Sequence, residues 1–213
     1  MFKAKHESYG VLTVKEFGYM YRIGVDLGGT NIAAAVIDKD FKIIKKGSVP
    51  TKAERPSDEI IDDMAKLCHD LCGSAGIDES EVSAVGIASP GIANHTDGVI
   101  EYSCNLPFRK YPICAEFAKR FKVDTVHVEN DANAAAWGEA VAGAAKGTSN
   151  SVMITLGTGV GGGIIIDNRV YSGFNYAGAE LGHIVIRVDG RACNCGRHGC
   201  WEAYSSATAL INM

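Results

Sequence analysis

The chain has 213 residues, of which 46% are hydrophobic and 22% charged, and a net charge of −4. This composition fits a globular protein of one or two domains with a sizeable core. The negative balance argues against nucleic acid and against an anionic membrane surface as partners. The sequence shows neither a membrane-spanning apolar run nor a signal peptide. It contains seven cysteines, and this odd number favours a reducing cytoplasm over a disulfide framework.

The first part of the chain predicts a β-meander followed by a helix. Residues 1–20 show no period and are interpreted as an N-terminal extension. Pro56-Ser57-Asp58-Glu59 predicts the start of a helix with Ser57 as its N-cap, and Gly73 predicts its end. Cys68 and Cys72 fall on the apolar face of this helix and are expected in the core. Short apolar runs joined by turn residues predict three antiparallel strands, at 23–26, 32–37 and 41–49.

The middle of the chain alternates predicted strands and helices and then repeats itself. Residues 25–38 resemble residues 154–167 at a constant offset of 129 residues, each copy reading strand, Gly/Thr turn, strand, acidic turn. Such a repeat predicts two related lobes, which we place at 21–132 and, for the start of the second lobe, 133–213. The other predicted elements are strands at 82–88 and 123–128 and helices at 112–121 and 131–145.

A cluster of potential metal ligands lies near the C-terminal end. Three of the seven cysteines, Cys193, Cys195 and Cys200, fall within eight residues of a glycine-rich loop, and His183 precedes them. Three thiolates and one imidazole make a closed tetrahedral zinc site. Buried free cysteines are the alternative interpretation, and His198, inside the loop, is an alternative ligand. We favour His183 because a ligand from outside the loop would close it onto the rest of the protein.

Two turns combine glycine with threonine and could bind phosphate. Glycine lets backbone N–H groups approach an anion, and the threonine hydroxyl adds a donor. One such turn alone is more often a simple hairpin, but two related turns could hold a phosphate chain from both sides. Asp26, just before the first turn, could hold Mg²⁺ through water. The turns are Gly28-Gly29-Thr30 and Gly157-Thr158-Gly159.

Asp131 is the candidate general base. It follows a predicted strand and begins a predicted helix, so we expect its carboxylate near the positive end of a helix dipole. A carboxylate there can orient a substrate hydroxyl and accept its proton during phosphoryl transfer. A plain N-cap is the commoner role for such a residue. Polar neighbours at other strand ends and loops favour the functional role: Asn130, Ser89-Pro90-Gly91, Glu180 and His183.

Six motifs, taken in order, resemble those of the ROK family (repressor, open reading frame, kinase), and among its members those of the glucokinases. The resemblance runs from about Met20 to the last residues. The motifs are Asp26-Leu27-Gly28-Gly29-Thr30, Ala88-Ser89-Pro90-Gly91, Glu129-Asn130-Asp131-Ala132-Asn133, Leu156-Gly157-Thr158-Gly159-Val160-Gly161-Gly162-Gly163, Glu180-Leu181-Gly182-His183 and the Cys193–Glu202 block.

The resemblance implies an α/β, actin-like (ribonuclease H-like) fold of two lobes, with a hexose and ATP bound between them. The implied reaction is ATP-dependent phosphorylation of the hexose 6-hydroxyl, with glucose as the expected hexose and Asp131 as the base. The implied ATP contacts are the two Gly/Thr turns, with Asp26 serving Mg²⁺, and the implied structural zinc ligands are His183, Cys193, Cys195 and Cys200. The implied hexose contacts are Gly91, Asn105, Asn130, Glu180, His183 and Glu202.

Family members continue beyond the Cys193–Glu202 block, so we expect this chain to hold an incomplete second lobe that stops inside a helix begun near Trp201. Homodimers or homotetramers are common in the family and are expected here. Two alternatives stay open: a sugar-responsive ROK transcriptional regulator, for whose DNA-binding helices residues 1–20 are too short, and a sugar-binding fragment without catalysis. The sequence does not separate glucose from N-acetylhexosamine, mannose or fructose.

Overall fold

A computed structural model describes residues 21–213, and the predicted extension over residues 1–20 lies outside the described residues. Two short 3₁₀ helices, η1 (Glu79–Glu81) and η2 (Leu181–His183), accompany the main elements. The main elements, in chain order, are β1 (Tyr21–Leu27), β2 (Asn31–Asp38), β3 (Ile43–Pro50), α1 (Ser57–Ala75), β4 (Val82–Ser89), β5 (Ile92–Asn94), β6 (Val99–Tyr102), β7 (Arg109–Tyr111), α2 (Ile113–Ala118), β8 (Val126–Asn130), α3 (Asp131–Ala142), β9 (Ser151–Leu156), β10 (Val160–Ile166), β11 (Arg169–Val170), α4 (Glu202–Ser205) and α5 (Ala207–Ile211).

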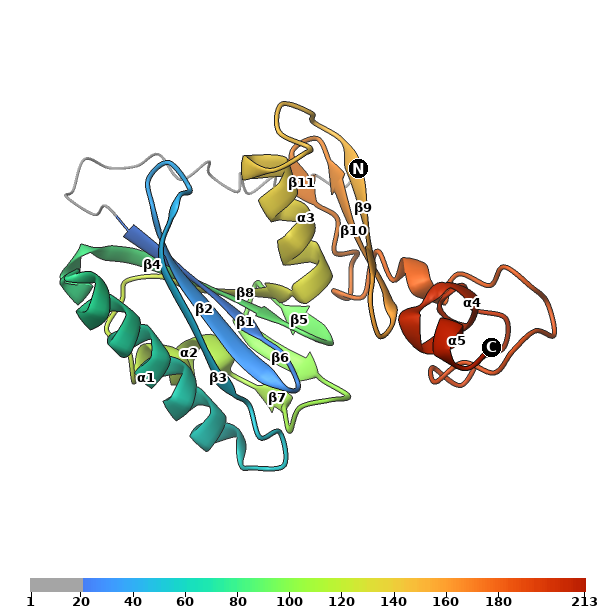
Figure 1. Ribbon diagram of the computed structural model, residues 1–213, viewed down its shortest axis with the longest axis horizontal. Coiled ribbons are helices and arrows are strands. Elements are labelled where there is room, and N and C mark those ends of the chain that lie inside the picture. Colours follow the sequence, from blue (N-terminus) through green and yellow to red (C-terminus); the bar gives the residue numbers. More distant parts are fainter. Residues whose placement is uncertain (1–20) are drawn as a thin grey trace, which may run out of the picture.

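The largest sheet has five strands in the order β3-β2-β1-β4-β8. The meander β1–β3 pairs antiparallel, while β4 and β8 join in parallel. Parallel strands need crossover connections, and α1 and α2 lie in these connections, on one side of the sheet in Figure 1. The carboxyl ends of β1, β4 and β8 therefore come together at one edge, which places Asp26, Ser89 and Asn130 close to one another.

The core lies between this sheet and the two helices. Alternate residues of β1, namely Ile23, Val25 and Leu27, are buried, as a strand with one covered face requires. The helices contribute Met64 and Phe117, among others, to the same cluster. Cys68 and Cys72 belong to it, as predicted, and burial raises the pKa of the Cys68 thiol to about 12, which keeps that thiol protonated.

Two smaller antiparallel sheets complete the fold. The sheet β11-β10-β9 follows α3, and the sheet β5-β6-β7 lies beside the carboxyl ends of β4 and β8. The predicted repeat is present as two hairpins, β1–β2 and β9–β10. Their registers differ by one residue, because Leu27 faces Ile32 whereas Leu156 faces Val160. The second turn is thus one residue shorter than the first.

Helix α3 joins the five-stranded sheet to the β11-β10-β9 sheet and packs tightly against β10. It begins directly where β8 ends, without an intervening loop, and lies against β9 and β10 (Figure 1). Glycine at 163 permits this approach: an added methyl group would collide with the Cβ of Ala136 and would lie 2.7 Å from the carbonyl oxygen of Ala132. Gly161 and Gly163 of β10 thus lie against α3, whereas Gly162 lies against Leu181 of η2.

We expect Gly163→Ala to lower the free energy of unfolding by about 1–3 kcal/mol, because α3 must move away from β10 to admit the methyl group. Urea denaturation measures the change. Gly138→Ala, on the exposed side of the same helix with open space around it, is the matched control. It should leave stability unchanged or raise it by up to about 1 kcal/mol, as alanine does in a helix. Equal losses for both variants would contradict the packing argument.

Several predicted boundaries were wrong. Ser57 is not the N-cap of α1: Pro56 occupies that position, and the Ser57 hydroxyl donates a hydrogen bond to the carbonyl of Pro107 at 3.1 Å. Gly73 lies within α1, which ends at Ala75 with Gly76 in the left-handed conformation.

The strand expected to end at Val128 extends to Asn130, and the helix expected to end at Ala145 ends at Ala142. The sheet β5-β6-β7 was not predicted, and the helix expected near Trp201 is divided into α4 and α5 at Ser206.

Among the described residues, none of the helices combines the length and apolar character needed to cross a membrane.

Candidate active site and metal centre

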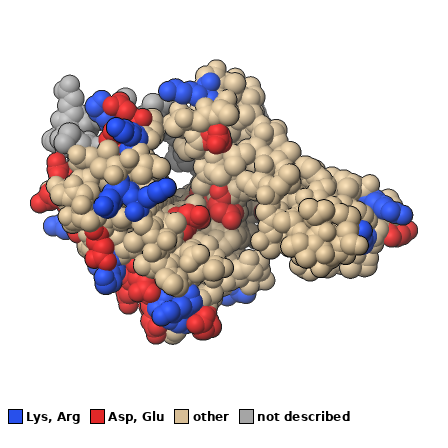
Figure 2. All heavy atoms as spheres, viewed as in Figure 1, with Lys and Arg blue, Asp and Glu red and all other residues tan. Residues whose placement is uncertain are grey.

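A large cleft lies between the five-stranded sheet and the segments that follow α3. Figure 2 shows acidic side chains gathered in this hollow. Most of the predicted site residues line it, including Asp131, Asn105, His183 and the Gly157-Thr158-Gly159 turn. The acids along its wall are Asp26, Glu129, Asp131, Asp167, Glu180 and Glu202.

Asp131 is the first residue of α3, as predicted. One of its carboxylate oxygens, Oδ1, accepts a hydrogen bond from the backbone N–H of Ala132 at 2.9 Å. The capping role falls instead to Asn130, whose Oδ1 accepts from Ala132 and Asn133 at 3.0 and 3.2 Å. The alternative interpretation of Asp131 as a plain N-cap is therefore wrong, and its second oxygen, Oδ2, is available to a ligand in the cleft.

Asn130 and Gly91 are neighbours. The Nδ2 group of Asn130 donates to the carbonyl oxygen of Gly91 at 3.1 Å, so one amide hydrogen remains for another acceptor. Gly91 has a φ of +98°, and a side chain there would come within 2.9 Å of the Cα of Ser103. Glycine is required at this position by both its conformation and its surroundings. Both residues therefore have structural roles, and neither is among the residues that line the cleft.

The acids of the cleft influence one another. Desolvation and the charge of Asp131 raise the pKa of Asp26 above its usual value. Desolvation also raises the pKa of Glu180, and the charges of Asp131 and Glu202 add to this effect, while His183 opposes it. These interactions place both Asp26 and Glu180 within electrostatic reach of Asp131. Such a concentration of acids favours a bound cation or several hydroxyl donors.

The two Gly/Thr turns differ in position: Gly157-Thr158-Gly159 lines the cleft, whereas Gly28-Gly29-Thr30 is not part of its lining. In the first, Gly28 donates to the carbonyl of Asn31 at 3.0 Å, and Gly29 lies against Asn105. In the second, the carbonyl of Thr158 accepts a hydrogen bond from the hydroxyl of Thr208, in α5, at 2.8 Å. The first turn is thus packed against a predicted hexose contact, and the second is fixed by the C-terminal helices.

Glu202 connects the cysteine block to the second turn. Its Oε2 atom accepts a hydrogen bond from the backbone N–H of Val160 at 2.9 Å, and Gly159 lies directly against its carboxylate. A side chain at position 159 would displace it. One oxygen of Glu202 therefore has a structural partner, and the other faces the cleft that Glu202 lines.

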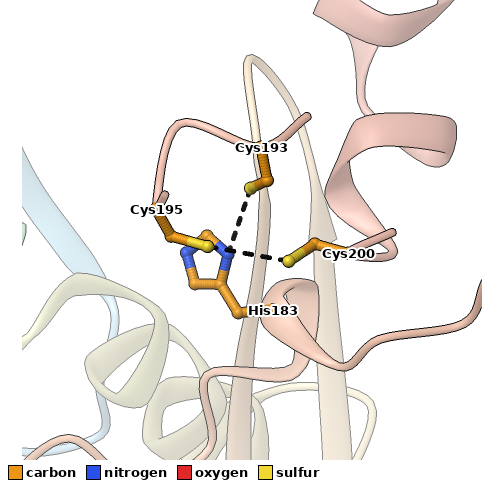
Figure 3. A group of neighbouring side chains, drawn as sticks. All are labelled: His183, Cys193, Cys195 and Cys200. Atoms are coloured by element: carbon orange, nitrogen blue, oxygen red, sulfur yellow. Dashed lines mark hydrogen bonds between the residues drawn. The ribbon is translucent and has the colours of Figure 1, made fainter. Parts of the chain in front are cut away.

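The four predicted metal ligands come together. Figure 3 shows the His183 ring, from η2, and the thiols of Cys193, Cys195 and Cys200 pointing toward one another. Their ligand atoms all lie within 4.8 Å of one another. Nδ1 of His183 is 3.6 Å from Sγ of Cys193, and Sγ of Cys195 is 3.6 Å from Sγ of Cys200. Ligands about 2.3 Å from a tetrahedral zinc ion are about 3.8 Å apart, so this donor set fits zinc.

The backbone around the cluster is shaped to hold it. Gly196 and Gly199 have φ values of +85° and +79°, as the turn back toward Cys200 requires. Arg197 donates a hydrogen bond from Nη2 to the carbonyl of His183 at 3.1 Å. Hydrogen bonds from Arg197 also lower the pKa of the Cys195 thiol to about 6. The lower pKa favours the thiolate, which is the form that binds metal. His198, the alternative ligand, lies outside the group of four.

The structure adds cleft residues that the sequence did not single out. His95, in the turn between β5 and β6, donates from Nδ1 to Glu129 at 3.1 Å, and the ring of Tyr176 meets the His95 ring edge-on. The hydrogen bond to Glu129 raises the pKa of His95. Glu129 could have been noticed, because it adjoins Asn130 and Asp131 at a strand end. His95 and Tyr176 carry no sequence signal, since only the fold brings them together.

The sheets and the cleft between them define an actin-like α/β protein, as predicted. Residues 22–213 match the ROK family, and the chain belongs to that family. The chain is 42% identical over 189 residues to a glucokinase of Streptomyces coelicolor, covering 89% of this chain and 57% of that protein. It is 32% identical over 192 residues to a xylose repressor of Bacillus subtilis, covering 90% of this chain and 49% of the repressor.

The fold agrees with solved structures of the same family. A ROK family glucokinase from Streptomyces griseus, in complex with glucose and AMPPNP, superimposes with a TM-score of 0.77 at 40% identity. That match covers 90% of this chain and 59% of the other chain. The chain thus spans little more than half the length of the kinases to which it is similar.

Proposed function

We propose that this chain binds a hexose and ATP in its cleft and serves the transfer of the ATP γ-phosphoryl group to the hexose 6-hydroxyl, with glucose as the expected hexose. The observation that carries the proposal is the position of Asp131, which faces the same cleft as Glu180, His183 and a Gly/Thr turn. The similarity to a glucokinase that holds glucose and AMPPNP supports the same substrates here.

In the proposed reaction Asp131 orients the sugar hydroxyl and accepts its proton. The hydrogen bond from Ala132 fixes Oδ1, which leaves Oδ2 to face the hydroxyl. The hydroxyl oxygen forms a bond to the γ-phosphorus, the bond from that phosphorus to the bridging oxygen breaks, and ADP leaves with the bond electrons. Positioning and charge stabilisation supply most of the catalysis in such transfers, so the fixed carboxylate matters more than its basicity.

The hexose would be held at the carboxyl edge of the five-stranded sheet. Glu180 and Glu202 would accept hydrogen bonds from sugar hydroxyls, and His183 would contribute its second ring nitrogen. Asn130 has one amide hydrogen for the sugar, and Gly91 and Asn105 would complete the pocket wall. The described contacts of Asn130 and Glu202 support this arrangement, because each residue keeps hydrogen-bonding capacity beyond its structural partner.

The phosphates of ATP would lie between the two Gly/Thr turns, where backbone N–H groups and the hydroxyls of Thr30 and Thr158 can donate to them. Asp26 would hold Mg²⁺, which neutralises phosphate charge when it is bound. The acidic cleft supports this assignment, because Asp26 and Asp131 together would repel ATP that carried no cation.

Zinc would be held by His183, Cys193, Cys195 and Cys200, with Nδ1 as the histidine ligand. Binding through Nδ1 leaves Nε2 for a sugar hydroxyl. The ion would stabilise the loop that carries Glu202 and take no part in the bond changes. We also propose a cytoplasmic location, consistent with reduced thiols, and a homodimer or homotetramer as the assembled state.

Glu180→Gln should raise the dissociation constant of glucose at least about tenfold, because a neutral amide is a weaker acceptor for two sugar hydroxyls than a carboxylate. Isothermal titration calorimetry measures the change, and the ATP affinity should stay within about twofold. Asp167→Asn is the control, since it removes the same charge from the cleft wall at the β10–β11 turn. A larger loss of ATP than of glucose affinity would place the sugar site elsewhere.

A coupled assay with glucose and ATP tests the activity itself, and calorimetry with a panel of hexoses tests the binding. Sugar binding without turnover would favour the sugar-binding fragment.

The similarity to the xylose repressor favours a second candidate, a sugar-responsive regulator. Tight, salt-dependent binding to operator DNA together with absent turnover would select that function.

A further inference from the structure

Three contacts join distant segments on one side of the cleft. His95, in the β5–β6 turn, donates to Oε2 of Glu129 at 3.1 Å. The ring of Tyr176, in the segment between β11 and η2, meets the His95 ring with centroids 5.0 Å apart and planes at 82°. The Tyr176 hydroxyl donates to Oγ1 of Thr96 at 2.9 Å. All four side chains line the cleft that also contains Asp131 and Glu180.

At one end of this set of contacts, Glu129 fixes the start of α3. Oε1 of Glu129 accepts hydrogen bonds from the backbone N–H of Asn130 at 2.9 Å and from Nδ2 of Asn133 at 3.1 Å. Asn133 is only 2% exposed. Glu129 therefore binds residues on both sides of Asp131, and His95 occupies its remaining oxygen. A change at His95 would reach the Asp131 carboxylate through Glu129 and the backbone that joins Glu129 to Asp131.

At the other end of this set of contacts, Tyr176 fixes the segment that carries Glu180. Tyr176 lies four residues before Glu180, and both Tyr176 and Ala179 have positive φ values, +60° and +64°. Residues other than glycine adopt this conformation only where other contacts enforce it. The Tyr176 ring and hydroxyl, both held by the β5–β6 turn, supply such contacts. The conformation of the Glu180 segment thus depends on a different part of the fold.

We propose that His95 and Tyr176 form a clasp that sets the position of Glu180 relative to Asp131 and thereby the affinity for the hexose. This inference rests on the proposed function, because it concerns the same sugar site. His95 and Tyr176 are positioning residues, since they act on the sugar through Glu129 and through the backbone before Glu180. The clasp is independent of the metal cluster, with which it shares no residue.

The test is calorimetry of glucose binding to the whole chain. Tyr176→Phe keeps the aromatic contact and removes the hydrogen bond to Thr96, so the dissociation constant of glucose should rise about three- to tenfold. His95→Ala removes both contacts and should raise it at least about tenfold. His95→Asn restores a donor toward Glu129 and should give an intermediate value. The affinity for ATP should stay within about twofold in every variant, which a general loss of structure would not allow.

Two controls separate the clasp from nonspecific effects. Thr96→Ser retains the hydroxyl acceptor and should bind glucose like the parent. Tyr111→Phe removes another tyrosine hydrogen bond, to Asp58 at 2.5 Å on the far side of the core, and should also leave glucose affinity unchanged. Parental glucose affinity in both Tyr176→Phe and His95→Ala would overturn the clasp and leave the proposed function intact. A parent chain that binds no hexose would overturn the proposed function, and the clasp with it.

Discussion

Asp131→Asn is expected to lower kcat for hexose phosphorylation at least about a hundredfold, the usual contribution of a positioned general base. The amide keeps an oxygen that can accept the hydrogen bond from Ala132, so the helix start should survive. It cannot accept the proton that leaves the sugar hydroxyl. Initial rates in the coupled glucose assay give kcat, and calorimetry gives the glucose and ATP affinities, which should both stay within about threefold.

The stability of Asp131→Asn and the turnover of a control variant complete this test. The free energy of unfolding should change by less than about 0.5 kcal/mol, as expected for a surface substitution away from the core. Asp167→Asn, which removes an acid from the cleft wall at the far end of α3, should retain nearly full turnover. If Asp131→Asn retained turnover within a few-fold of the parent, Asp131 would not be the base, and another carboxylate of the cleft would have to accept the proton.

Cys195→Ser is expected to abolish zinc binding, reducing the metal content from about one ion per chain to near zero, because serine cannot supply a thiolate. Without the ion, His183 loses its fixed orientation, and the loop that leads to Glu202 loosens. We therefore also expect the dissociation constant of glucose to rise at least about tenfold, as commonly follows the loss of groups that orient a site. Elemental analysis measures the zinc, and calorimetry measures the glucose affinity.

The chain offers two matched controls for this substitution. Cys104→Ser changes an exposed cysteine outside the cluster, and His198→Ala changes a histidine within the same loop that is not among the four converging residues. Both variants should retain zinc, and His198→Ala should also retain glucose affinity. Full zinc content in Cys195→Ser would refute the assigned ligand set. Loss of zinc in His198→Ala would show that His198 takes the place of His183.

The fold could be predicted where sequence periodicity was strong. The apolar runs of β1, β2 and β4 and the 3–4 spacing of α1 identified these elements, because each buries one continuous face. The sheet β5-β6-β7 was missed because its strands are only three or four residues long, too short for a period to show. The break at Ser206 was missed because its cause is the capping hydrogen bond to Ala209 and the tie from Ala207 to Gly157.

The candidate site could likewise be predicted only in part. The four candidate metal ligands and Asp131 were recognisable because their residue types and spacing imply a chemistry. The structure brings the four candidates together and puts Asp131 at the start of α3. The capping function of Asn130 was not foreseen, since it depends on where β8 ends. The contacts of His95 with Glu129 and Tyr176 span 34 and 81 residues, and no local pattern encodes them.

The direct passage of β8 into α3 has a mechanical consequence. A lobe rotation needs a pivot, and the covalent connection from the five-stranded sheet to the β11-β10-β9 sheet begins at Asn130 and Asp131. We expect the hinge axis to pass close to the Asp131 carboxylate. Opening and closing of the cleft would then move its far walls over large distances, while Asp131 would stay nearly still.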